Sequence, residues 1–210
     1  MRDFFCFNML IQIIVIIFFF YASNFYPQKD TTENNFAAIS HPKKFLESGF
    51  EYYSPSHWNR QIKTININGL IGKEFVQSIG LQFFAGVTIT HAWGNIIAVN
   101  KNNKEEKFQT SAMGFGPLIL LRVQPLTIGR FSFSVDGIGG IILYNKPFPP
   151  GGDYYNFMFR LGGTIAFYIG NDLNLNIGLR RLHISNGQGV GSFNPFYEGT
   201  GLSLNVSKQF

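Results

Sequence analysis

Residues 173–180 read Leu-Asn-Leu-Asn-Ile-Gly-Leu-Arg, so each odd position is large and apolar and each even position is small or polar. Successive side chains of a β-strand point to opposite faces, and this period of two therefore predicts a strand with one apolar face. Outer-membrane barrels repeat such alternation in segments of about ten residues. The same pattern recurs in four further segments, over residues 79–90, 131–143, 157–169 and 202–209.

The polar face of these strands separates a membrane barrel from a soluble one. A soluble β-sandwich or lipocalin-like barrel also alternates, but its polar face meets water and should be rich in Lys and Glu. Here the second face consists mainly of Gly, Ser, Asn and Thr, and its few charges are Arg122, Asp136, Arg160 and Arg180. We therefore expect the apolar faces to contact lipid and these four residues to form a polar network in the lumen.

The composition supports a membrane protein. Of the 210 residues, 45% are hydrophobic, 17% are aromatic and only 14% are charged, against roughly 25% charged residues in a soluble domain. The net charge of +5 is scattered, and no basic stripe alternates with aromatic residues, so nucleic acid is not expected as a partner. Cys6 is the only cysteine, which excludes a disulfide scaffold.

Three weaker segments bring the number of predicted strands to eight, at residues 45–53, 61–71 and 110–123. The connections alternate between short turns and longer polar or Gly/Pro-rich loops, as periplasmic turns and extracellular loops do. The longer loops are expected at residues 54–60, 91–107, 145–153 and 185–197. The sequence thus predicts an all-β fold over residues 43–210, an eight-stranded antiparallel transmembrane β-barrel of the outer-membrane type.

The N-terminal part is expected to direct export. Residues 4–22 form an apolar stretch that only Asn8 and Gln12 interrupt, and a spanning helix needs roughly 20 apolar residues. We interpret residues 1–23 as a signal peptide, with an uncleaved anchor as the alternative, followed by a polar segment over residues 24–42. Without its signal peptide the chain has no cysteine, which suits an oxidising periplasm and a place in the outer membrane of a Gram-negative cell.

One region of the sequence has the residue types of a catalytic site. Residues 180–187 read Arg-Arg-Leu-His-Ile-Ser-Asn-Gly, and residues 194–199 read Asn-Pro-Phe-Tyr-Glu-Gly. His183 and Ser185 share the lipid-facing parity of their strand, roughly 7 Å apart, and Glu198 has the lipid-facing parity of the next strand. A hairpin would bring the three together at the extracellular end of the barrel, where the amphiphile is lipid A. This arrangement favours ester cleavage, with Ser185 as nucleophile, His183 as base and Glu198 as the acid that orients the imidazole.

Neighbouring residues have candidate supporting roles. Asn186, Asn194 and the backbone amide near Gly187 are candidate donors to the developing oxyanion, and Arg181 is a candidate ligand for a lipid phosphate. For His183 or Ser185 taken alone, a polar rim at the membrane interface is the alternative interpretation. The remaining histidines are far from the cluster in sequence and have no metal-ligand spacing, so a structural role is expected for His41, His57 and His91.

The C-terminal motifs resemble those of a known family. The pattern His183-x-Ser185-Asn186-Gly187, followed by a Gly-rich loop, Asn194-Pro195 and Glu198, is similar to the lipid A deacylase (PagL) family of outer-membrane enzymes. The resemblance implies an eight-stranded barrel with a Ser–His–Glu triad on its outer surface, which hydrolyses the 3-linked acyl ester of lipid A without a metal or organic cofactor. It implies Asn194 as an oxyanion contributor. This chain departs from the family in spacing, because Glu198 falls fifteen residues after His183, one more than expected, and in having Phe196 where many relatives have glycine.

Two other functions stay open at this point. The first is a non-catalytic barrel that serves as a scaffold or binds lipopolysaccharide. The second is an outer-membrane phospholipase that uses the same triad. The expected partners are lipid A or lipopolysaccharide as substrate and the lipid of the outer membrane, and the sequence leaves a homodimer open.

Overall fold

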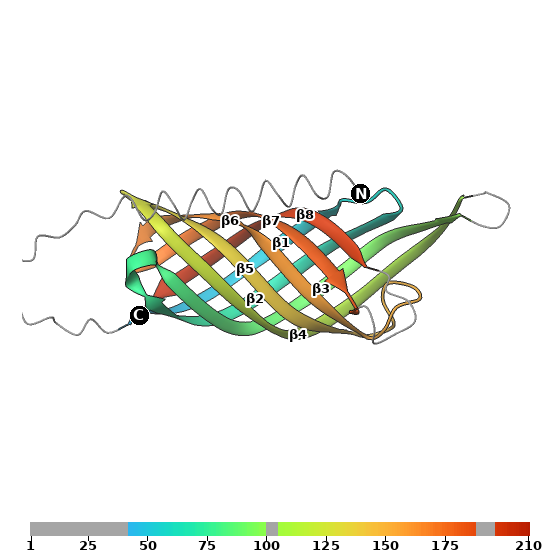
Figure 1. Ribbon diagram of the computed structural model, residues 1–210, viewed down its shortest axis with the longest axis horizontal. Coiled ribbons are helices and arrows are strands. Elements are labelled where there is room, and N and C mark those ends of the chain that lie inside the picture. The colour runs from blue at the N-terminus through green and yellow to red at the C-terminus, as the bar shows by residue number, and fades with distance from the viewer. Residues whose placement is uncertain (1–41, 100–104, 188–195) are drawn as a thin grey trace, which may run out of the picture. The chain divides into compact units, whose positions relative to one another are not determined.

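Eight antiparallel strands pair in chain order and close into a barrel through β1 and β8 (Figure 1). The computed structural model describes residues 42–99, 105–187 and 196–210. The strands are β1 (Lys44–Pro55), β2 (Arg60–Val76), β3 (Leu81–Val99), β4 (Glu105–Ile128), β5 (Phe131–Tyr144), β6 (Tyr155–Gly170), β7 (Leu173–Ser185) and β8 (Tyr197–Gln209). This topology confirms the predicted eight-stranded antiparallel barrel.

The predicted signal peptide at residues 1–23 and all but the last residue of the predicted polar segment at 24–42 lie outside the described residues. Within residues 42–99, 105–187 and 196–210, the structure contains no helix that is long and apolar enough to cross a membrane.

Burial alternates along the strands as the sequence pattern predicts. In β7, Ile177 and Leu179 are more than half exposed, whereas Asn176 before them and Arg180 after them are buried. The large apolar side chains thus form the outer face, which is the arrangement of a barrel surrounded by lipid. Odd-numbered residues point outwards on β2, β3, β4 and β7, and even-numbered residues do so on β8.

Two strands are longer than the sequence predicts. The loop expected over residues 91–107 is mostly strand, because β3 continues to Val99 and β4 begins at Glu105, with paired residues throughout. Figure 1 shows this hairpin extending past the other strands at one end of the barrel. Beyond the apolar band an outward side chain need not be apolar, so the alternation fades while the backbone hydrogen bonds continue.

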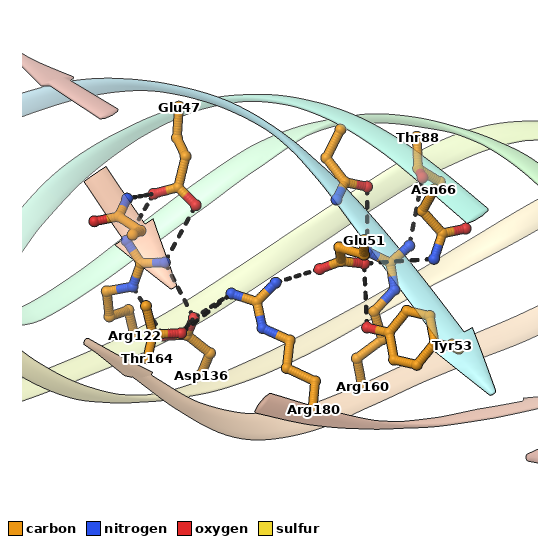
Figure 2. Close-up of polar contacts among 12 residues, drawn as sticks. Glu47, Glu51, Tyr53, Asn66, Thr88, Arg122, Asp136, Arg160, Thr164 and Arg180 are labelled. Atoms are coloured by element: carbon orange, nitrogen blue, oxygen red, sulfur yellow. Dashed lines mark hydrogen bonds and ion pairs between the residues drawn. The ribbon is translucent and has the colours of Figure 1, made fainter. Parts of the chain in front are cut away.

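A chain of ion pairs runs through the lumen (Figure 2). The guanidinium of Arg122 contacts Glu47 at 2.7 Å and Asp136 at 2.8 Å, and Asp136 in turn contacts Arg180 at 2.5 Å. All four side chains are almost completely buried. The predicted lumen network is therefore present, and Glu47 of β1 is a member that the sequence analysis did not include.

A second glutamate of β1 completes this network. Glu51 pairs with Arg180 and, at 2.5 Å, with Arg160, and it also accepts a hydrogen bond from Tyr53 at 3.2 Å. Three arginines thus alternate with three carboxylates, so that the buried charges balance. The order along this lumen network is Glu47, Arg122, Asp136, Arg180, Glu51 and Arg160.

The loop between β5 and β6 fills the lumen at the end where β7 terminates. Phe148 is fully buried, and its ring lies 5.0 Å from Tyr144 and 5.7 Å from Tyr197, measured between ring centroids. The hydroxyls of Tyr144 and Tyr197 are hydrogen-bonded at 2.7 Å, and Asn156 Nδ2 donates to the Phe148 carbonyl at 2.8 Å. Side chains therefore occupy the interior at this end of the barrel.

Candidate active site

The pairing of β7 with β8 places His183 directly opposite Glu198. The Nδ1 atom of His183 lies 3.0 Å from Oε1 of Glu198, which is hydrogen-bonding distance. Both residues are on the outward parity of their strands, so the contact lies on the outer surface of the barrel. A carboxylate bound to one imidazole nitrogen fixes the ring and leaves the other nitrogen to act as a base.

The second oxygen of Glu198 has two further partners. Arg181 donates to Oε2 at 2.7 Å, and Nε2 of His57 lies 3.1 Å from the same oxygen. These side chains cover Glu198, which is only 5% exposed, whereas His183 is 42% exposed. The charge of the carboxylate is thus stabilised by several donors while His183 stays accessible.

Phe196 packs against both imidazoles of this cluster. Its ring is stacked on His183, with centroids 5.8 Å apart and an interplanar angle of 23°, and it meets His57 edge-on at the same distance. The guanidinium of Arg60 lies 4.3 Å above the Phe196 ring, and Arg60 also donates to the Phe196 carbonyl. Phe196 therefore holds the His183 ring in place.

Ser185 is the last residue of β7 and lies on the same outward row as His183. Its backbone pairs with Phe157 of β6, and His183 pairs with Phe159. Within the described residues no hydrogen bond joins the Ser185 hydroxyl to the His183 ring. Catalytic hydrogen bonds are often long in the absence of substrate and shorten when it binds.

The other predicted site residues have different surroundings. Asn186 is buried, and its Nδ2 donates to Asp153 of the β5–β6 loop at 2.8 Å. Gly187 has a φ of 78°, and a Cβ there would lie 3.1 Å from the Phe157 ring, so this position favours glycine. Arg181 contacts Glu198, as described above, and Asn194 lies outside the described residues.

His57 is the partner that sequence analysis missed, because it treated the histidines outside the motif as structural. Closure of the barrel makes β1 the neighbour of β8, with Pro55 paired to Gly199 and the backbone amide of Ser56 donating to the Glu198 carbonyl at 3.0 Å. The β1–β2 connection is thereby placed beside the start of β8. The sequence already predicted that the eight strands close into a barrel, and this closure places residues 54–60 beside the start of the last strand. It could therefore have identified His57 as a neighbour of Glu198.

Among the residues that the structure describes, no group of three or more His, Cys, Asp or Glu is arranged to hold a metal ion.

No protein-family model matches this chain, and no curated protein sequence matches it. The fold is similar to the crystal structure of the outer-membrane enzyme PagL, with a TM-score of 0.51, 15% identity, and coverage of 77% of this chain and 97% of PagL. It also matches the solid-state NMR structure of the outer-membrane protein AlkL in DMPC bilayers, with a TM-score of 0.33, 14% identity, and coverage of 88% and 95%. At these identities the likeness is one of fold: the chain is an eight-stranded barrel of the outer-membrane type.

Proposed function

We propose that this protein is an outer-membrane serine esterase that removes an acyl chain from lipid A by hydrolysing its 3-linked ester. The observation that carries the proposal is the His183–Glu198 contact of 3.0 Å on the outer wall, with Ser185 two positions along the same row. A polar group on the lipid-facing side costs free energy. The convergence of these side chains at one place therefore favours a function over an incidental polar rim.

The proposed mechanism of ester hydrolysis follows from the contact between Nδ1 of His183 and Glu198, which leaves Nε2 free to accept a proton. With Nδ1 bound to Glu198, the Nε2 atom takes the proton of Ser185 as its oxygen attacks the ester carbonyl. The backbone amide at Gly187 and the side chain of Asn194 are the expected donors to the oxyanion. Collapse of this intermediate expels the sugar hydroxyl, which receives the proton from His183. Water then attacks the acyl-enzyme by the same route and releases the fatty acid.

The surface beside Ser185 suits an acyl chain. Phe157 and Phe159, which pair with Ser185 and His183, are about half exposed on the outer wall, and Leu179 continues the apolar row of β7. An ester at Ser185 would therefore leave its hydrocarbon chain against these side chains and within the bilayer. We expect this end of the barrel to face the outside of the cell, because the longer connections lie here, and lipid A is the amphiphile of that leaflet.

The direct test is mass spectrometry of lipid A from cells that express the wild type or Ser185→Ala. We expect the wild type alone to lower the mass by one hydroxyacyl chain. Ser185 faces the bilayer and not the packed lumen, so the variant should keep the heat-modifiable gel mobility of a folded barrel. Unchanged lipid A with a folded wild-type barrel would refute the proposal, and release of fatty acid from glycerophospholipids instead would identify a phospholipase.

A further inference from the structure

A hollow lies on the outer wall beside the candidate active site. Its volume is about 790 Å³, and it lies between the β1–β2 connection and the outer faces of β2, β3 and β4. Such a volume falls in the range of ligand pockets. The side chains that line it include His57, Trp58, Lys63, His91, Trp93 and Gln109.

The strand register shows where the outer wall changes from apolar to polar. The outward residues Ile67, Ile89 and Phe115 form one cross-strand row, and all three are exposed and apolar. Four residues further along each strand, the corresponding row is Lys63, Trp93 and Ser111, and the row after it is Gln61, Asn95 and Gln109. The hollow therefore begins at the edge of the lipid-facing band, at the depth of lipid headgroups.

The lining chemistry selects the type of headgroup. Lys63 and two histidines line the hollow, and none of its described lining residues is Asp or Glu. The lining also holds amide side chains and both tryptophans of the chain, Trp58 and Trp93. A cation binds phosphate, amides bind hydroxyls, and the exposed indole ring of Trp58 provides a flat surface for packing. We propose that this hollow binds the phosphorylated sugar headgroup of a glycolipid.

His57 connects the hollow with the catalytic cluster. It lines the hollow, and its Nε2 lies 3.1 Å from Oε2 of Glu198, which holds His183. Barrel strands are about 4.8 Å apart, so β2 and β7, three spacings apart, are within the reach of a disaccharide and its acyl chain. A headgroup in the hollow would thus orient the ester towards Ser185. This last step rests on the proposed esterase function, whereas headgroup binding does not.

Tryptophan fluorescence tests the binding directly, since both reporters line the hollow. The protein would be purified from membranes as the Ser185→Ala variant, which removes turnover, and titrated with glucose 1-phosphate. We expect a saturable change in emission, and about tenfold weaker affinity in Lys63→Gln because a charge-assisted contact is lost. Lys73→Gln is the matched control: Lys73 has the same outward parity on β2, but at the opposite end of the strand. Its affinity should equal that of the parent.

Two further ligands decide what is recognised. Glucose and inorganic phosphate should each bind at least about tenfold more weakly than glucose 1-phosphate, because each offers only part of the headgroup. Absence of a saturable change, equal affinity for either fragment, or unaltered binding by Lys63→Gln would overturn the inference. Because the assay needs no hydrolysis, unchanged lipid A in the cell experiment would refute the lipid A esterase and leave this result standing.

Discussion

At the scale of single residues, the geometry of the site depends on the two carboxylate oxygens of Glu198, which have different hydrogen-bond partners. Oε1 binds His183, and Oε2 binds both Arg181 and His57. The donors to Oε2 hold the carboxylate in one orientation, so that Oε1 stays aligned with the imidazole. Hydrogen bonds in which one partner is ionised, as the carboxylate is here, are stronger than those between neutral groups, and these side chains also shield the carboxylate from competing water.

The first prediction concerns this carboxylate. Glu198→Gln keeps the shape of the side chain but removes the charge that stabilises the imidazolium, and it can present an amide N–H to Nδ1 and favour the wrong tautomer. We expect kcat for ester hydrolysis to fall about a thousandfold, measured on purified protein in detergent. A loss below about threefold would mean that Glu198 does not assist His183.

The second prediction concerns His57 as a positioning residue. His57→Ala leaves Oε2 with Arg181 as partner and removes the edge contact with Phe196, so kcat should fall about tenfold with KM little changed. His57→Gln provides the control, because its amide can still donate to Oε2, and should recover most of the activity. Equal activity in wild type and His57→Ala, with both folded, would contradict the role.

Some contacts of the site could be predicted from the sequence, and others could not. Strand parity and the β7–β8 hairpin were sufficient to predict the proximity of His183 and Glu198, because both are local relations. His57 is 141 residues from Glu198 in sequence and comes close only through closure of the barrel. The stacking of Phe196 on His183 depends on the conformation of a connection, which a period-two pattern does not describe.

At the scale of elements, the alternation predicts the strands well where lipid requires an apolar outer face. It fails at the strand ends: β3 and β4 continue through residues that sequence analysis assigned to a loop. The same pattern contains no information on the β5–β6 loop, which has no periodic partner. Its buried Phe148 packs on Tyr144 and Tyr197 and links the loop to β5 and β8.

The third prediction concerns this loop. Phe148→Ala removes a fully buried ring and leaves a cavity, so the free energy of unfolding should fall by about 3–5 kcal/mol. Urea titration of the barrel in lipid vesicles measures the change. Phe108→Ala is the control, since Phe108 is half exposed on β4 and its loss should change the stability by about 0.5 kcal/mol or less. Equal effects of the two substitutions would show that the loop does not anchor the barrel end.

At the scale of the whole molecule, the lumen network joins strands that are distant around the barrel. Arg122 of β4 contacts Glu47 of β1 and Asp136 of β5, and Arg180 of β7 extends the network through Asp136 to Glu51. Each charge of the lumen network has an opposite partner, which offsets the cost of removing it from water. The four residues with lumen parity were predictable from the sequence, but the matching glutamates of β1 were not, because that strand alternates weakly.

The fourth prediction tests this balance of charges. Arg122→Met leaves Glu47 without its ion-pair partner, and we expect a loss of about 3–5 kcal/mol in the free energy of unfolding. The double variant Glu47→Gln/Arg122→Met removes both charges and should recover more than half of the loss. Urea titration in vesicles provides the comparison, with Arg130→Met in the exposed β4–β5 turn as the control. A double variant as unstable as the single one would show that packing, and not charge, sets the stability.

The outward placement of His183 and Ser185 also affects how a lipid reaches them. A site on the wall of a barrel is reached by sideways diffusion within one leaflet, so the lipid need not leave the membrane before or after reaction. For an esterase of the proposed kind, the frequency of encounter is then set by the mole fraction of substrate in that leaflet. Other lipids compete simply by occupying the annulus around the protein, and the packing of the membrane itself becomes a regulator of turnover.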